Sequence, residues 1–157
     1  MNDFTHINKD GKVAMVEVSQ KEISLRKAVA RSVVELPAEV ADKLLNGDIV
    51  TKKGSVFQTA IIAGIMAAKK TGELIPLCHP LSLDNCKVEI TVDKNHLVID
   101  CTATITGRTG VEMEALTGAS IAALTVYDMC KALSHDIIIR DIKLVEKTGG
   151  KNDFKRT

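Results

Sequence analysis

Aromatic side chains are scarce in this sequence, whose 157 residues include no Trp, one Tyr and three Phe. Single-stranded nucleic acids stack on such side chains, so their scarcity argues against a nucleic-acid-binding protein. Strong net charge is also missing, because 21 Lys and Arg residues face 20 Asp and Glu residues and leave a formal charge of +1. The overall field is therefore not expected to attract nucleic acid or an anionic membrane. Any anion site must come from local clusters of basic side chains.

Long apolar runs and closely spaced cysteine pairs are missing as well. No segment reaches the length of a membrane span, and residues 1–12 lack the apolar stretch that a signal peptide needs. The cysteines form no CxxC pair, which predicts free thiols in a reducing compartment. They are Cys78, Cys86, Cys101 and Cys130. The sequence therefore predicts a cytoplasmic protein without a membrane-spanning segment.

The remaining composition is that of one globular domain. Hydrophobic residues make up 45% and charged residues 26% of the chain, and no internal repeat or linker interrupts it. A chain of this length buries about 68–70% of the surface that its unfolded form exposes, which is enough for a real core. We expect a single domain over residues 1–157, with flexible ends at about 1–14 and 148–157.

Alternation of apolar and polar residues predicts four strands. Residues 28–36 have a period of two, with small residues on one face. Residues 86–92 and 97–105 alternate in the same way on either side of Lys94-Asn95, which predicts a half-buried antiparallel hairpin. A further strand is expected over residues 137–145.

Helical signals separate these strands. Residues 37–45 are expected to form a short helix that Gly47 closes. Ser55 begins a capping box before an apolar helix that should end at about Lys70. Residues 111–133 have the periodicity of the main helix. The order β-α-α-β-β-α-β predicts an α+β fold of two layers, an antiparallel sheet with helices on one face, as in a ferredoxin-like plait.

One stripe of the main helix carries a charged pair. At about 100° per residue, Asp128 and Lys131 fall on or beside the stripe that holds Thr117, Ile121 and Leu124. A buried carboxylate needs a cation or a hydrogen-bond donor, and Lys131 is the local candidate. An ion pair on the helix surface, at the edge of the stripe, fits the spacing equally well. The sequence leaves both interpretations open.

Two carboxylates, Glu112 and Glu114, follow the flexible glycines Gly107 and Gly110. In an extended segment both would point the same way and could accept hydrogen bonds from the N–H groups of a guanine or pterin ring. If the helix has already begun, they diverge by about 200° and act as first-turn charges that face the helix dipole. The helical alternative is the simpler of the two.

A rigid loop places Cys78 and His79 between two prolines. Zinc is not expected there, since adjacent residues of an extended segment point to opposite sides and no second Cys/His pair follows at ligand spacing. We expect His79 to bond a backbone group, or to contact a phosphate or a base.

Lys53 lies in the basic segment 51–55, directly before a helix N-terminus. Free N–H groups and the helix dipole favour an anion at such a position, and a phosphate is the natural candidate. The segment is not a Walker motif because the required glycine spacing is missing, and a solvated basic loop is the alternative. Lys147 and Lys151, which flank the tail glycines, allow the same two interpretations.

Taken together, these segments resemble the MoaC family of molybdenum cofactor biosynthesis over nearly the whole chain. The resemblance rests on five blocks, which are residues 63–65, 67–70, 74–80, 109–117 and 124–132. The family converts 3',8-cyclo-7,8-dihydro-GTP to cyclic pyranopterin monophosphate and releases pyrophosphate. The resemblance implies a lyase with this activity. It also implies a ferredoxin-like subunit in a homohexamer, a trimer of dimers with active sites at subunit interfaces.

The resemblance further implies roles for single residues. The family's catalytic residues match Asp128, Lys131 and Lys53. Its substrate-binding residues match a larger set, namely Leu77, Cys78, His79, Glu112, Met113, Glu114, Lys147 and Arg26. No metal ligand is among them. Because the reaction consists of proton transfers, no cofactor is expected, although magnesium could accompany the triphosphate.

Two positions depart from the family's usual pattern. Ser55 stands where the family usually has Asp, and Asn152 stands where it usually has Ser. Ser55 can serve as a helix N-cap instead.

Two rival functions remain. One is an inactive ferredoxin-like ligand-binding module, and the other is a metal-binding protein that uses Cys78 and His79 with a third ligand. The first does not account for Asp128 and Lys131 beside an apolar stripe.

Overall fold

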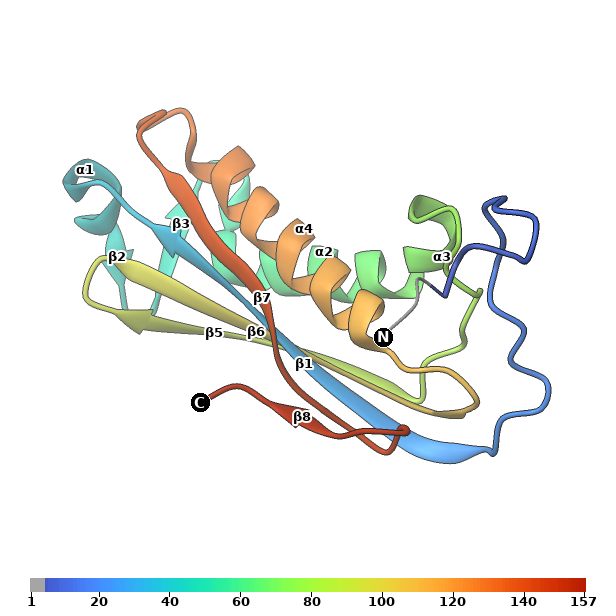
Figure 1. Cartoon of the computed structure of the whole chain (residues 1–157). Coiled ribbons are helices and arrows are strands. Elements are labelled where there is room, and N and C mark those ends of the chain that lie inside the picture. The colour runs from blue at the N-terminus through green and yellow to red at the C-terminus, as the bar shows by residue number, and fades with distance from the viewer. Residues whose placement is uncertain (1–4) are drawn as a thin grey trace.

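The computed structural model describes residues 5–157 and has a five-stranded antiparallel sheet at its centre (Figure 1). The strands lie in the order β5-β6-β1-β7-β8. Their bounds are Ser24–Glu35 for β1, Asn85–Asp93 for β5, His96–Gly107 for β6, Ile138–Thr148 for β7 and Phe154–Lys155 for β8. The predicted hairpin is confirmed, since β5 and β6 pair in register around the turn at Lys94 and Asn95.

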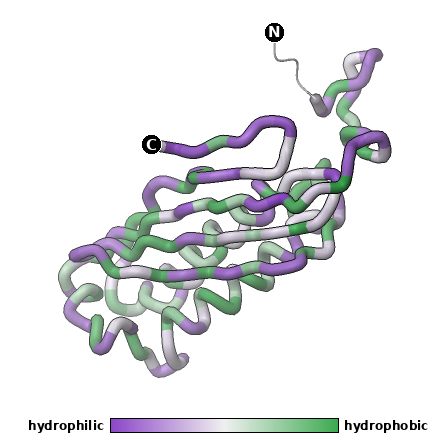
Figure 2. Tube along the Cα trace, turned by 90° about the horizontal axis from the view of Figure 1, so that it is seen from below, coloured by the Kyte–Doolittle hydropathy of each residue, from purple (hydrophilic) through white to green (hydrophobic). Residues whose placement is uncertain are grey.

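Two long helices, α2 (Val56–Lys69) and α4 (Glu112–Cys130), cover one face of this sheet. They lie side by side in Figure 1 and behind the strands in Figure 2. α2 contacts β5, whereas α4 crosses β1, β6 and β7. The succession β1-α2-β5-β6-α4-β7 is the β-α-β-β-α-β order of a ferredoxin-like plait. The predicted α+β class, with helices on one face of an antiparallel sheet, is confirmed.

Small side chains fill the layer between α4 and the sheet. The core side of α4 consists largely of alanines that solvent does not reach, namely Ala115, Ala119, Ala122 and Ala123. The inner face of β6 carries the residues that the alternation predicted, Leu97, Ile99, Cys101, Ala103 and Ile105, and all five are buried. Short side chains on the helix allow it to pack closely against larger ones on the sheet.

α2 and α4 meet at two glycines. A Cβ atom at Gly64 would lie 2.9 Å from the carbonyl oxygen of Gly118. A Cβ atom at Gly118 would lie 2.5 Å from Sγ of Cys101. Both distances are shorter than real Cβ contacts, so a side chain at either position would force its neighbours to move. The sulfur of Cys101 occupies the space that a side chain at position 118 would need.

The helix predicted over residues 37–45 is wrong in its second half. α1 covers only Ala38–Ala41, and the chain then forms a small sheet with the order β2-β3-β4. The bounds of these strands are Leu44–Leu45, Asp48–Thr51 and Gly54–Ser55. Asn46 and Gly47 both have left-handed φ values, of 52° and 78°, and form the turn between β2 and β3. An Asn-Gly pair is a strong hairpin signal, which explains why the helix stops early.

The ends of the chain, for which flexibility is predicted, contain backbone hydrogen bonds in the structure. The tail that was expected to be mobile includes β8, which pairs with the end of β7. Near the other end, the backbone N–H of Ala14 donates to the carbonyl oxygen of His6 at 2.9 Å. Residues 1–4, which were expected to be flexible, lie outside the described residues.

After α2, Thr71–Leu74 forms a further short helix, α3. No helix of residues 5–157 has the length and apolar character needed to cross a membrane.

Candidate functional site

A cavity of about 210 Å³ lies at the N-terminal end of α4. It is termed the carboxylate pocket here, because Glu112 and Glu114 lie in its wall. The pocket brings together six residues that the family resemblance assigns to substrate binding, namely Leu77, Cys78, His79, Glu112, Met113 and Glu114. The loop before β5 and the first turn of α4 therefore face the same space.

The two carboxylates of this pocket have different surroundings. Both belong to the first turn of α4, so they diverge, as the helical alternative predicted. Glu114 is only 4% exposed, and burial raises the pKa of its carboxyl group, with a further increase from the nearby charge of Glu112. Oε1 of Glu112 lies 3.1 Å from Nζ of Lys147. The pocket thus holds one carboxylate paired with a lysine and one carboxyl group whose ionisation burial disfavours.

The loop side of the pocket is held in place by a backbone contact. Nε2 of His79 lies 2.8 Å from the carbonyl oxygen of Val16, so the ring N–H donates to the main chain. This is one of the roles that the sequence predicted for His79. Burial, together with the charge of Glu114, raises the pKa of the Cys78 thiol, which leaves it a poor nucleophile. Within residues 5–157, no three His, Cys, Asp or Glu side chains are grouped to hold a metal ion.

A larger cavity, of about 560 Å³, adjoins the carboxylate pocket. It is termed the basic cavity here, because five basic side chains line it, namely Lys21, Arg26, Lys27, Lys147 and Lys151. Lys21, Gly110 and Glu112 line both cavities, so the two share a wall. Nε of Arg26 donates to the carbonyl oxygen of Gly107 at 3.1 Å, which holds the guanidinium group at this wall.

The C-terminal glycines complete the basic cavity. Gly149 has a φ of 84° and passes so close to β1 that a Cβ atom would lie 1.9 Å from the carbonyl oxygen of Leu25. Only glycine fits such an approach. The hydroxyl of Ser24 donates to the carbonyl oxygen of Gly149 at 2.6 Å. The close passage of the tail against β1 brings Lys147 and Lys151 to the cavity wall.

The three residues matched to catalysis meet at the other end of α4, in what is termed the Asp128 cluster. Oδ1 of Asp128 lies 2.8 Å from Nζ of Lys131, and Oδ2 lies 3.4 Å from Nζ of Lys53. The side chain of Asp128 is 56% exposed. The surface ion pair is therefore the correct alternative, and the buried carboxylate is wrong. The stripe of α4 that includes Leu124 points away from the sheet, since alanines occupy the opposite side.

Ion pairing sets the charge of this cluster. The hydrogen bond and the charge of Lys131, followed by the charge of Lys53, lower the pKa of Asp128 below its ordinary value. The same contact raises the pKa of Lys131. Asp128 is thus an ionised carboxylate between two ammonium groups. Clustered acids and bases with shifted pKa values are typical of sites that transfer protons.

Within one chain, the Asp128 cluster does not reach the carboxylate pocket. Glu114 and Asp128 lie at opposite ends of α4. A helical rise of about 1.5 Å per residue puts them about 21 Å apart along the axis. The structure therefore gathers the predicted binding residues around two adjoining cavities and the predicted catalytic residues in a separate group.

Asp48, which no sequence pattern singled out, ties the loop that carries Lys53 to the start of α2. Oδ1 of Asp48 accepts backbone hydrogen bonds from Ile49 at 2.7 Å and from Phe57 at 3.0 Å, and Oδ2 accepts from the hydroxyl of Ser55. Burial disfavours the ionised form of Asp48, but these hydrogen bonds outweigh burial and lower its pKa. Ser55 itself accepts the backbone N–H of Gln58 at 3.0 Å, which confirms the N-cap half of the predicted capping box. The return bond from the Gln58 side chain is not among the hydrogen bonds of residues 5–157. The Asn46-Gly47 turn directly before Asp48 could have indicated that Asp48 begins a hairpin strand rather than continuing a helix.

Relatives of known name resemble the chain closely. Molybdenum cofactor biosynthesis protein 1 of Dictyostelium discoideum is 50% identical over 96% of this chain and 27% of its own length. The molybdenum cofactor biosynthesis bifunctional protein of Synechocystis sp. is 49% identical over 98% of this chain and 46% of its own length. Cyclic pyranopterin monophosphate synthase of Xanthomonas campestris pv. campestris (strain B100) is 53% identical over 96% of this chain and 92% of its own length.

The chain thus spans less than half of the first two relatives and nearly all of the third. The model of the MoaC family matches residues 15–150, a range that includes every predicted site residue. Both cavities and the Asp128 cluster are built mainly from this range. The chain therefore belongs to the MoaC family.

Proposed function

We propose that this chain acts as a cyclic pyranopterin monophosphate synthase in molybdenum cofactor biosynthesis. The substrate is 3',8-cyclo-7,8-dihydro-GTP, and the release of pyrophosphate makes the enzyme a lyase. The observation that carries the proposal is the junction of the carboxylate pocket with the basic cavity at Lys21, Gly110 and Glu112. The first cavity suits a ring with N–H groups, and the second suits a triphosphate.

The two cavities divide the work of substrate binding. Glu112 and Glu114 accept hydrogen bonds from the N–H groups of the ring, which orients it in the pocket. Arg26 and Lys147 neutralise the triphosphate and the charge that develops as pyrophosphate leaves. Met113 and residues 77–79 of the loop before β5 supply further parts of the wall. This arrangement fixes the ring and the phosphates at the same time.

The Asp128 cluster supplies the proton transfers. Opening the cyclised purine and rebuilding it as a pyranopterin moves protons at several nitrogen and oxygen atoms. The Asp128 carboxylate accepts a proton, and the ammonium group of Lys131 donates one. Lys53 holds the second oxygen of Asp128 and adds positive charge near the phosphates.

The separation of the two groups favours an active site shared between subunits. We propose a homohexamer, a trimer of dimers, in which the Asp128 cluster of one subunit meets the cavities of its neighbour. Ile62, Met66 and Leu124 are each more than half exposed on the two long helices, and Leu124 lies one helical turn from Asp128. Exposed apolar side chains beside a functional group are typical of a surface that another subunit covers.

No resident metal or organic cofactor is required by this scheme, and magnesium would enter only with the triphosphate. Proton transfer and electrostatic stabilisation by the side chains described above account for each step. We further propose a cytoplasmic location, where reduced thiols are stable and GTP-derived substrates are made.

The proposal is tested by mixing the purified protein with freshly prepared 3',8-cyclo-7,8-dihydro-GTP. Pyrophosphate release is followed directly, and the product is oxidised to a fluorescent pterin. We expect Asp128→Asn to bind substrate nearly normally but to lower kcat by about 10²- to 10⁴-fold, the usual contribution of general acid–base catalysis. Asp93→Asn, an exposed position at the end of β5, is the matched control and should retain full activity.

Each outcome of this experiment discriminates between functions. Pyrophosphate and pterin from the wild type, with loss only in Asp128→Asn, support the synthase. A wild type that binds the nucleotide without converting it would instead favour the inactive ligand-binding module. Activity that depends on metal bound to the purified protein would favour the metal-binding rival.

A further inference from the structure

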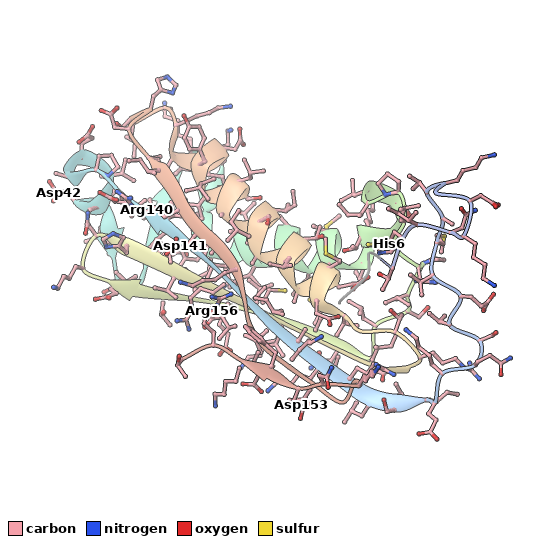
Figure 3. The ribbon with its side chains drawn as sticks, viewed as in Figure 1. His6, Asp42, Arg140, Asp141, Asp153 and Arg156 are labelled. Atoms are coloured by element: carbon pink, nitrogen blue, oxygen red, sulfur yellow. The ribbon has the colours of Figure 1, made fainter. Side chains whose placement is uncertain are left out.

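The N-terminal segment forms part of the carboxylate pocket, although sequence analysis assigned no substrate-binding residue to it. Residues 5–18 are termed the N-terminal arm here. Its pocket-lining residues are Thr5, His6, Val16 and Val18. Residues 5–14 fold into a small hairpin, in which Ile7 and Val13 form an isolated bridge and Oδ1 of Asn8 accepts two backbone hydrogen bonds in the turn. The hairpin is thus ordered by its own contacts. Figure 3 labels His6 on this arm.

His79, a residue of the carboxylate pocket, holds the N-terminal arm against the loop before β5. The ring N–H of His79 donates to the carbonyl oxygen of Val16 at 2.8 Å, which joins the arm to the loop before β5. Val16 is half-buried but most of the arm is exposed, so the arm has little apolar packing of its own against the body. A segment with few buried contacts is placed mainly by such specific hydrogen bonds.

The ring also needs hydrogen-bond donors in the pocket wall, and the side chains there that can donate include Lys21, Thr109 and His6. A purine-derived ring has acceptor atoms as well as N–H groups, whereas ionised carboxylates such as Glu112 accept only. Nε2 of His79 already donates to Val16. Lys21 lines both cavities, where its charge suits the phosphates. His6 is the imidazole that lines this pocket without a hydrogen bond from its side chain among the contacts of residues 5–157.

We propose that the N-terminal arm completes the carboxylate pocket and that His6 is a further substrate-binding residue, whose imidazole N–H donates to an acceptor atom of the ring. His79 is then the positioning residue that holds the arm over the pocket. The inference rests on the proposed function, because the ring is that of the proposed substrate. The inference gives the N-terminal arm, which precedes the sheet in the sequence, a direct role in substrate recognition.

The test uses the full chain with two substitutions that separate hydrogen bonding from ring stacking. Loss of one hydrogen bond should raise the KM of His6→Phe by about five- to tenfold, because Phe keeps an aromatic ring but no donor. His6→Gln keeps a donor and should retain most of the affinity. Lys9→Ala, in the exposed turn of the same hairpin and outside both cavities, is the matched control with an unchanged KM. Melting temperatures should agree among all four proteins.

A second measurement reports on the arm without turnover. His79→Ala removes the bond to Val16, so trypsin should cleave after Lys9 and Lys12 several-fold faster than in the wild type. Added 3',8-cyclo-7,8-dihydro-GTP should slow this cleavage in the wild type and much less in His6→Phe. An active wild type with an unchanged KM in His6→Phe overturns the inference and leaves the proposed function standing. A wild type that neither binds nor converts the nucleotide overturns both.

Discussion

Asp128 lies 2.8 Å from Lys131 and 3.4 Å from Lys53, so the two lysines do not lower the pKa of Asp128 equally. Lys131 is the larger cause of the lowered pKa of Asp128. Such a carboxylate stabilises the folded state above its unfolded pKa and loses this contribution as the pH falls through its folded pKa. The contribution is small, because the pair is exposed.

Replacing Lys131 should therefore return Asp128 towards ordinary behaviour. In Lys131→Met we expect the pKa of Asp128 to rise towards the ordinary value of about 3.9, because its main hydrogen-bond donor is gone. Carboxyl-carbon NMR titration of the wild type and the variant measures this directly. Lys53→Met is the comparison and should produce a smaller rise. A larger rise in Lys53→Met than in Lys131→Met would contradict the assignment.

Glu114 should behave in the opposite way, because burial raises its pKa. At pH values above the ordinary glutamate pKa of about 4.3, the unfolded chain releases a proton that the folded chain retains, so stability falls as pH rises. Glu114→Gln removes this titration. We expect its melting temperature to exceed that of the wild type at pH 7 and to equal it below about pH 4. Thermal unfolding between these pH values, without substrate, decides the matter.

The same substitution should weaken substrate binding. An ionised or partly ionised carboxylate accepts a stronger hydrogen bond than an amide oxygen, and its loss lowers affinity by about 10- to 100-fold. Equilibrium binding of the cyclised nucleotide measures this effect. A stabilised variant with unchanged affinity would show that Glu114 faces the protein interior rather than the substrate.

At the scale of elements, the β3–β4 hairpin positions Lys53 through Asp48 and Thr51. The hydroxyl of Thr51 accepts from the backbone N–H of Lys53 at 3.1 Å and donates to the carbonyl oxygen of Gly54 at 3.3 Å. Asp48 fixes the base of the hairpin to the first turn of α2. The position of Lys53 therefore depends on the contact between a hairpin and a helix end.

Removing this contact should affect both stability and turnover. We expect Asp48→Ala to lower the free energy of unfolding by about 1–2 kcal/mol, the usual effect of losing a helix-end cap and its hydrogen bonds. It should also lower kcat more than it raises KM. Adding Ser55→Asp to this variant places a carboxylate at the N-cap and should restore part of both properties. Urea unfolding and steady-state kinetics test the pair, and the absence of rescue would contradict a capping role.

The elements that sequence predicted well are those with long periodic patterns. The hairpin of β5 and β6, the capped helix α2 and the main helix α4 all have such patterns. The small sheet was missed because strands of two to four residues are too short to show periodicity, and only the Asn46-Gly47 turn indicates them. β8 was missed for the same reason, since its pairing covers two residues.

The residues of the site were predicted by the family resemblance better than by their spacing in the sequence. The resemblance named residues that the structure brings together in the two cavities, whereas spacing alone left Asp128 between two interpretations. Apolar spacing placed Leu124 on the core side, but the side chain is 53% exposed. Periodicity shows that a face is apolar, but not whether the same chain or another subunit covers it. Asp48 and the N-terminal arm depend on contacts between segments that no local pattern encodes.

At the scale of the whole molecule, Glu114 and Asp128 lie about 21 Å apart along α4, and the proposal that two subunits share each active site can be tested by subunit mixing. Glu114→Ala disables the carboxylate pocket, and Asp128→Asn disables the catalytic cluster. If each active site combines the pocket of one subunit with the cluster of another, a mixed dimer contains one intact site. Dissociating the two inactive variants together and reassembling them should therefore recover activity that neither has alone.

The control for this experiment combines both substitutions in one chain and mixes it with Asp128→Asn, so that no dimer can form an intact site. Recovery in the first mixture but not in the second supports shared sites. Inactive mixtures in both cases, from assemblies shown to be of mixed composition, would place each complete site within one subunit.

The close approach of Gly118 to Cys101 makes the order of two substitutions matter in this chain. A methyl group at position 118 meets the sulfur of Cys101 at 2.5 Å, whereas Cys101→Ala only vacates space. When both residues change, losing the sulfur first relieves the closest of these contacts, whereas gaining the methyl group first passes through an overpacked core. A double-mutant cycle on the two positions would measure their coupling energy, and the stabilities of the two single variants would show which order is tolerated.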